Sequence, residues 1–205
     1  MPLPDYPANL IYDLPSIVER MDLAKLFTKA QPLEVELGCG DASFLVELAS
    51  RHPERNFIGV ERLLGRLRKL DRKGNRAGLT NLRGVRIESA YFLEYLLPRH
   101  SASVLHIYFP DPWPKKKHRK YRLINERFPE LARATLLQGG VVYLRTDDKD
   151  YFEQMTEVFG RDQDFRPVET PAELGELLTD FEKEFQERGI RTLHTAYQLK
   201  SRPSG

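Results

Sequence analysis

LEVELGCGDASFLVELASR, residues 33–51, is the stretch that decides the fold. A short apolar run (33–37) leads into a turn with two glycines, Gly38 and Gly40, and apolar residues at helical spacing follow from 42 to 51. A strand that passes through a glycine turn into a helix is the repeating unit of a doubly wound α/β sheet. Glycines in such a turn also let a ligand approach backbone N–H groups closely. This stretch therefore predicts the fold class and one side of a binding site.

Apolar runs and amphipathic segments alternate along the rest of the chain. Further strands are expected at 56–61, 83–87, 104–109, 141–146, 165–169 and 192–198, and helices at 16–27, 63–76, 91–97, 123–137, 149–159 and 172–188. The runs at 104–109 and 141–146 are almost entirely apolar, which is typical of central parallel strands. We predict one α/β domain over residues 1–205, with a short helical lead (1–30), no separate second domain, and ligands bound beyond the carboxyl ends of the strands.

Composition and charge exclude several classes of protein. The chain of 205 residues is 40% apolar and has a net charge of +2, so it is neither disordered nor a general polycation. Its single cysteine, Cys39, excludes an internal disulfide and a multi-cysteine zinc site, and we predict a packing role for it and no metal. The sequence contains neither a signal-peptide pattern nor a run of about 20 apolar residues. We therefore expect a cytoplasmic protein with no membrane partner.

Acidic residues flank the glycine turn and end the next predicted strand. Glu36 lies two residues before Gly38, where a carboxylate can meet a cationic group, and Glu61 lies about 20 residues further on, where it can accept both hydroxyls of a ribose. Ser43 stands where a dinucleotide-binding turn would have its third glycine, which disfavours a dehydrogenase. We predict that Glu36, Gly38, Gly40 and Glu61 bind S-adenosyl-L-methionine, a nucleoside with an amino-acid tail. A solvated strand end is the alternative for Glu61.

The run VLHIYFPDPWPKKKHRKYR, residues 104–122, places Asp111 between two prolines and beside Trp113, the only tryptophan. The prolines restrict the backbone and hold the carboxylate in a fixed orientation. An ionised carboxylate only accepts hydrogen bonds, and guanine offers N1–H and N2–H₂ donors on one edge. Because guanine N7 has no proton to lose, holding it in line with a sulfonium methyl group can supply much of the acceleration. A related pattern serves methylation of an adenine amino group, and spacing alone does not separate the two.

Six cations within eight residues follow the aspartate. They are Lys115, Lys116, Lys117, Arg119, Lys120 and Arg122, with His118 and Tyr121 between them. A charge run is often only a solvated face, but this run adjoins the predicted active site. We therefore expect these cations to contact RNA phosphates.

These residues resemble the bacterial tRNA (guanine-N7-)-methyltransferase family over about residues 33–188. FPDPWPKKKHRKYRLIN is the most specific element, and LEVELGCG, NFIGVE, NLRG, LARATLLQGGVVYLRTDD and TDFEKEF support it in the same order. The resemblance implies a Rossmann-like methyltransferase fold, with a mostly parallel seven-stranded sheet, an antiparallel last strand and helices on both faces. It also implies S-adenosyl-L-methionine-dependent methylation of N7 of a guanosine in the variable loop of tRNA.

The resemblance further implies roles for individual residues. Those expected to bind the cofactor are Glu36, Gly38, Gly40, Glu61, Glu88, Ser89 and the catalytic Asp111, and those expected to bind substrate are Lys115, Asp147, Thr179, Asp180, Phe181 and Glu182. From the residues alone, Thr179 and Glu182 form an ordinary capping box. Two positions depart from the family pattern: Ala42 replaces a third glycine, and Glu88-Ser89 replaces an adenine-binding aspartate.

Three hypotheses remain open at this point. The first is the tRNA guanine-N7 methyltransferase, and the second is a methyltransferase acting on an adenine amino group or on a small molecule. The third is a non-catalytic RNA-binding protein on the same fold. The sequence is compatible with a monomer or a homodimer.

Overall fold

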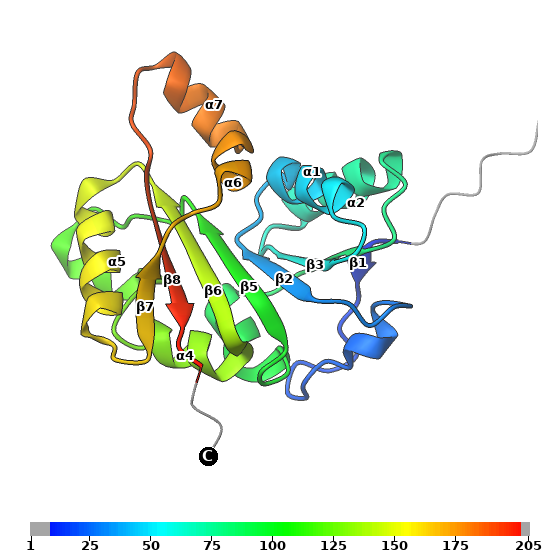
Figure 1. The fold of residues 1–205 in the computed structure, drawn as a ribbon. Helices are drawn as coiled ribbons and strands as arrows, with labels where there is room; N and C mark the ends of the chain where they lie inside the picture. The colour runs from blue at the N-terminus through cyan, green and yellow to red at the C-terminus, as the bar shows by residue number, and fades with distance from the viewer. Residues whose placement is uncertain (1–8, 202–205) are drawn as a thin grey trace, which may run out of the picture.

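The computed structural model describes residues 9–201, which form an eight-stranded sheet with helices on both faces (Figure 1). The strands are β1 (Ile11–Tyr12), β2 (Leu33–Leu37), β3 (Asn56–Val60), β4 (Leu82–Val85), β5 (Ala102–Tyr108), β6 (Leu136–Thr146), β7 (Phe165–Val168) and β8 (Leu193–Leu199). Their order across the sheet is β1-β4-β3-β2-β5-β6-β8-β7. β8 runs antiparallel to both of its neighbours, and the other strand pairs are parallel. The predicted doubly wound, mostly parallel sheet with an antiparallel last strand is confirmed, but it has eight strands instead of the seven expected, because the short β1 pairs with the edge of β4.

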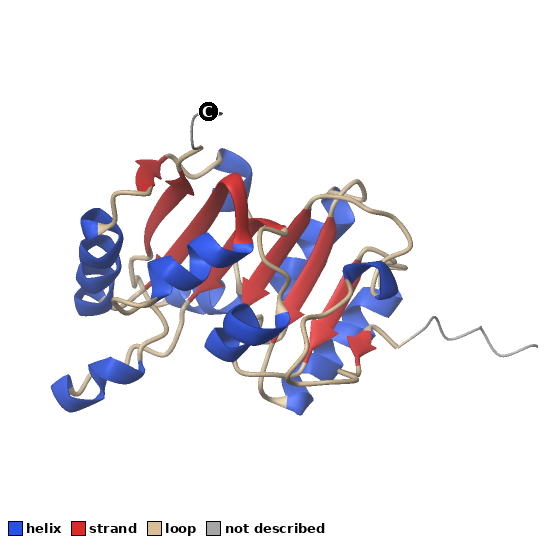
Figure 2. Cartoon of the chain, turned by 90° about the horizontal axis from the view of Figure 1, so that it is seen from below, coloured by secondary structure: helices blue, strands red, loops and turns tan. Residues whose placement is uncertain are grey.

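The helices cover both faces of the sheet. They are α1 (Ser43–Arg51), α2 (Leu64–Arg76), α3 (Ser89–Tyr91), α4 (Phe128–Thr135), α5 (Lys149–Arg161), α6 (Ala172–Glu176) and α7 (Asp180–Glu187), with short turns η1 (Leu23–Lys25), η2 (Phe92–Leu96) and η3 (Lys116–Tyr121). Apolar side chains of α1, α2 and α6 pack on one face of the sheet, and those of η2, α4 and α5 pack on the other. Figure 2 shows this two-sided cover from below.

Three helix predictions differ from the structure. Residues 16–27 contain only η1, because the Ser16 hydroxyl accepts from the nearby Val18 N–H instead of capping a helix, and Val18 is 79% exposed. The helix predicted at 123–137 is only α4, because residues 136 and 137 belong to β6 and the Ile124 N–H is held by the Tyr151 hydroxyl. The helix predicted at 172–188 is two helices, because Thr179 begins a new one. The added strand β1 has only two residues and carries no periodic pattern.

Candidate active site

The sheet changes winding direction at β2, which lies between β3 and β5. Ligands of open α/β sheets bind beyond the strand ends at such a point. A cavity of about 530 Å³ lies there, and its lining includes Gly38 after β2, Glu61 after β3, Ser89 after β4, and Asp111 and Trp113 after β5. We call it the Asp111 cavity. Asp111, which lies between two prolines, therefore faces the same cavity as the glycine turn.

A second cavity of about 230 Å³ adjoins the first. Its lining includes Glu36, Gly40, Thr179 and Phe181, and we call it the Glu36 cavity. The two cavities share lining residues, namely Gly38, Arg66, Tyr108 and Phe109. The site therefore has an inner end at Glu36 and an outer end at Asp111, joined at the glycine turn.

The glycine turn has the conformation for which the glycines were singled out. Gly38 has φ 81° and Gly40 has φ 54°, values in the left-handed region that glycine adopts without steric cost. Ala42 also lies in this region, with φ 61°, and its methyl group packs in the apolar cluster with Phe44 and does not line either cavity. The departure from a third glycine therefore leaves the cavity space unchanged. Burial raises the pKa of the Cys39 thiol, which keeps that side chain protonated.

Glu36 is the least satisfied polar group of the site. Its carboxyl is 4% exposed, and Oε2 accepts no hydrogen bond from the described residues. Burial raises the pKa of Glu36 to about 8; Arg145 opposes this shift, and the nearby Asp41 and Glu61 add to it. A buried carboxyl with one unpaired oxygen suits a cationic ligand group. The open glycine turn and this orphaned oxygen fit the amino-acid end of S-adenosyl-L-methionine.

The other acids predicted for the cofactor already hold backbone groups. Glu61 is buried; its Oε1 accepts from the Leu63 N–H at 2.8 Å, and its Oε2 lies 3.8 Å from Arg66 Nη1. A carboxylate has about four acceptor sites, so Glu61 retains capacity for ribose hydroxyls. Glu88 caps α3 through the N–H groups of Ala90 and Tyr91, at 3.0 and 2.8 Å. That Glu88 or the adjacent Ser89 contacts the adenine of the cofactor stays a prediction.

The loop around Asp111 is held in an unusual backbone conformation. Phe109 has φ 52° and Trp113 has φ 44°, in a region that bulky residues rarely occupy. The Phe109 N–H donates to the Arg145 carbonyl at 2.9 Å, and the Pro112 carbonyl accepts from Arg122 Nε at 2.6 Å. Asp111 itself is exposed. Its carboxylate is thus presented to the cavity by a backbone that is fixed on both sides.

Arg122 corrects one prediction about the cationic run. Its side chain is 1% exposed, pairs with Asp150 at 2.7 Å and Gln154 at 2.7 Å, and lies over the Tyr151 ring. It therefore anchors the Asp111 loop to α5 and is not free to bind phosphate. Arg119 also pairs with Asp150. The exposed cations of the run are the four lysines, Lys115, Lys116, Lys117 and Lys120.

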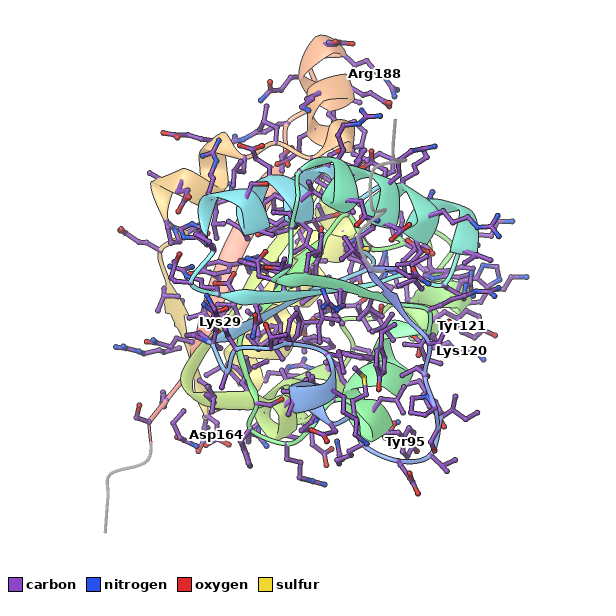
Figure 3. All side chains as sticks on the ribbon, turned by 90° about the vertical axis from the view of Figure 1, so that its right-hand side faces the viewer. Lys29, Tyr95, Lys120, Tyr121, Asp164 and Arg188 are labelled. Atoms are coloured by element: carbon purple, nitrogen blue, oxygen red, sulfur yellow. The ribbon has the colours of Figure 1, made fainter. Side chains whose placement is uncertain are left out.

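The aromatic residues of the run gather next to these lysines. The Trp113 ring centroid lies 5.4 Å from that of Tyr121 and 5.8 Å from that of His118. Lys120 and Tyr121 are neighbours at the surface (Figure 3), with Lys120 Nζ 5.2 Å from the Tyr121 ring centroid. Trp113, Lys120 and Tyr121 all line the Asp111 cavity. Its outer wall therefore offers planar rings and positive charge.

The predicted substrate segment 179–182 divides into two parts. Thr179 and Phe181 line the Glu36 cavity, and the side chain of Asp180 lies outside what the structure describes. Glu182 completes the capping box with Thr179 and accepts from Arg145 Nη1 at 2.8 Å, and it is 5% exposed. Glu182 thus positions Thr179. Lys115 and Asp147 are exposed and line neither cavity, so their substrate contacts stay predictions.

Arg145 lines neither cavity but supports residues that do, and sequence reasoning missed it. Its guanidinium lies 4.2 Å from the Tyr108 ring centroid and donates to the Leu177 carbonyl at 2.9 Å. A charged residue inside the apolar run VVYLRT was the available signal. Among residues 9–201 the structure shows no helix suited to cross a membrane, and within the same range no group of His, Cys, Asp and Glu suited to hold a metal ion.

Comparison with known proteins places this geometry in context. A family model described as "Putative methyltransferase" matches residues 30–199. The tRNA (guanine-N(7)-)-methyltransferase of Chromohalobacter salexigens is 37% identical over 187 residues, which are 88% of this chain and 74% of that protein. The enzyme of the same name from Sodalis glossinidius is 36% identical over 184 residues, covering 87% and 75%. The crystal structure of the 16S rRNA methyltransferase KamB covers 89% of this chain and 95% of its own, with a TM-score of 0.61 and 17% identity, and shows the same fold.

Proposed function

Since this chain belongs to the tRNA (guanine-N7-)-methyltransferase family and is a methyltransferase that uses S-adenosyl-L-methionine, we propose that it methylates N7 of a guanosine in the variable loop of tRNA, with Asp111 orienting and polarising the guanine. One observation supports the role of Asp111 above all. Its carboxylate and the glycine turn line a single cavity, so a base and a cofactor held by these groups would meet.

The residues of the inner end would hold the cofactor, which supplies an electrophilic methyl group on a sulfonium. Glu36 would pair with its amino group, Gly38 and Gly40 would admit it against the backbone, and Glu61 would accept the ribose hydroxyls. Tyr108 and Phe109 form the wall that both cavities share, and Tyr108 is 6% exposed.

Asp111 would act on the guanine without removing a proton from N7. Its carboxylate accepts hydrogen bonds from N1–H and N2–H₂, which draws electron density into the ring and makes N7 a better nucleophile. The product carries a positive charge, which the carboxylates of Asp111 and Glu61 in the Asp111 cavity would favour. Positioning two reactants in line can contribute about 7 to 11 kcal/mol to the barrier reduction. The backbone conformation at Phe109 and Trp113 would support that positioning.

The test is methyl transfer to an unmodified tRNA transcript, followed by digestion and mass spectrometry of the nucleosides. We expect 7-methylguanosine, and we expect it to disappear when the variable-loop guanosines of the transcript are replaced by adenosine. Methylated adenosine as the sole product would contradict the proposed base. Methylation of guanosine that survives the loop replacement would contradict only the proposed position.

A further inference from the structure

The exposed face of α2 carries a large excess of positive charge. Residues 62–76 include seven Lys or Arg and a single acid, Asp71. Asp71 Oδ1 accepts from the Leu10 N–H at 2.8 Å and from Asn75 at 3.0 Å, so it holds its neighbours and does not face the cations. Leu67 and Leu70 are fully buried on the opposite side of the helix. Because the whole chain has a net charge of only +2, this is a local concentration of charge.

Four of these cations lie in one line along the helix, and a fifth, Arg62, lies just before it. Arg66, Lys69, Lys73 and Arg76 recur at spacings of three, four and three residues, which keeps them on a single helix face, while Arg62 precedes the N-cap residue Leu63. We call these five residues the α2 cation row. With a rise of about 1.5 Å per residue, its helical part is about 15 Å long. Arg62, Lys69 and Arg76 are exposed, while Arg66 lies near Glu61 and Lys73 pairs with Asp41.

The row borders the site from end to end. Arg62 and Arg66 line the Asp111 cavity, and Arg66 and Lys69 line the Glu36 cavity. Lys73 and Arg76 line a third cavity of about 520 Å³ between α1, α2 and the α6–α7 segment. Figure 1 shows α1 and α2 on the same face of the sheet, with α6 beside α1. The row therefore starts at the predicted base-binding cavity and leads away from it.

From this placement we propose that the α2 cation row binds the phosphate backbone of the tRNA as a second surface, separate from the lysines at 115–120. The proposal rests on the proposed function, because it takes tRNA as the ligand. A nucleic-acid strand is a linear series of anions, which matches a linear series of cations better than a scattered patch would. A strand on this row would reach the Asp111 cavity along α2, where Arg62 and Arg66 line its wall.

The experiment compares two double variants of the same helix. Lys69→Gln/Arg76→Gln removes two charges from the row, and Arg68→Gln/Arg72→Gln removes two exposed charges that line none of the three cavities. Both lose the same net charge. Affinity for an unmodified tRNA transcript is measured without cofactor at several salt concentrations, so that changes in cofactor binding do not enter.

We expect the row variant to bind tRNA about tenfold more weakly near 0.1 M salt. The slope of log K against log salt should become less negative by about 1.4 to 1.8, because two phosphate contacts are lost. The control variant should stay within about twofold of the wild type. Equal weakening in both variants would show a general charge effect and overturn the proposal. Unchanged affinity in the row variant, as expected if the row serves an acidic protein, would also overturn it.

The outcomes for the proposed function are separate. If the wild type forms no 7-methylguanosine but the row variant binds tRNA more weakly than the wild type, the proposed function is contradicted and the proposed RNA surface is supported. A wild-type protein that forms 7-methylguanosine while both variants bind tRNA normally would contradict only the surface.

Discussion

At the residue scale, the proton on Glu36 depends on what occupies its cavity. Burial raises the pKa of this carboxyl to about 8, so it is protonated at pH 7 when no cation is present. A bound ammonium group favours the carboxylate, and binding should therefore release a proton. We expect calorimetry of S-adenosylhomocysteine at pH 7 in two buffers of different ionisation enthalpy to show close to one proton released. Glu36→Gln should bind more weakly and show no buffer dependence. Identical enthalpies for the wild type in the two buffers would contradict the assignment.

Asp111 carries the prediction for turnover. In Asp111→Asn an amide with two donors replaces a group that only accepts, and the charge that favours a cationic product is lost. We expect kcat to fall by about 10²- to 10³-fold, while the fold and the affinity for S-adenosylhomocysteine are kept. Steady-state methylation of tRNA and calorimetry measure the two quantities. A kcat within a few fold of the wild type would remove the carboxylate from the mechanism.

At the element scale, Arg145 fastens the α6–α7 segment to the sheet. It is 4% exposed and pairs with the equally buried Glu182, which caps α7 through Thr179. Arg145→Met leaves that carboxylate buried without its cation, and we expect a loss of about 3 kcal/mol in the free energy of unfolding by urea. The double variant Arg145→Met/Glu182→Gln should recover part of the loss, because no buried charge is left unpaired. A double variant that is less stable than Arg145→Met would argue against the pair.

The elements also show how far local patterns predict this fold. β2, α1, β3 and α2 follow directly from apolar periodicity and the glycine turn, and each lies within two residues of its predicted bounds. The helix at 16–27 was wrong because residues 17–20, which would form its first turn, are all exposed, and a capping-box pattern does not form a helix turn that has nothing to pack against. At 172–188 the capping box at Thr179 was recognised, but its consequence, a break between two helices, was not.

Some residues of the candidate site could be predicted from the sequence, and others could not. Residues at strand ends could be placed from topology alone, so Asp111, Glu61 and the glycine turn were expected to lie together. The buried position of Arg122 could not be predicted, because its partner Asp150 lies 28 residues away and a run of charged residues does not indicate which of them form ion pairs. The same limit hid the Arg145–Glu182 pair, which is 37 residues apart in the sequence.

At the scale of the whole molecule, two carboxyls on β2, those of Glu34 and Glu36, give the stability of the ligand-free protein opposite dependences on pH. Glu34 is buried, which alone raises its pKa, but His106 at 2.8 Å and Arg55 at 2.8 Å outweigh burial and hold the pKa of Glu34 below its ordinary value of 4.5. A group with a lowered pKa contributes stability above about pH 4.5, which is lost as the pH falls through its folded value. Glu36 has a raised pKa, so its contribution is complete below about pH 4.5 and is lost as the pH rises toward 8.

These two groups together place the stability maximum of the ligand-free protein near the ordinary carboxyl pKa of about 4.5 to 5, with a decline on both sides. We expect Glu36→Gln to flatten the decline in stability between pH 5 and 8, because no buried carboxyl at residue 36 then needs to ionise. Glu34→Gln should leave the decline between pH 5 and 8 unchanged and reduce the decline on the acid side. Saturating S-adenosylhomocysteine should flatten the alkaline limb of the wild type as Glu36→Gln does, because the bound ammonium group stabilises the carboxylate. Urea unfolding at each pH measures all of these effects. If the decline in stability between pH 5 and 8 keeps its slope in Glu36→Gln, another group controls that decline. The ionisation assigned to Glu36 would then be wrong.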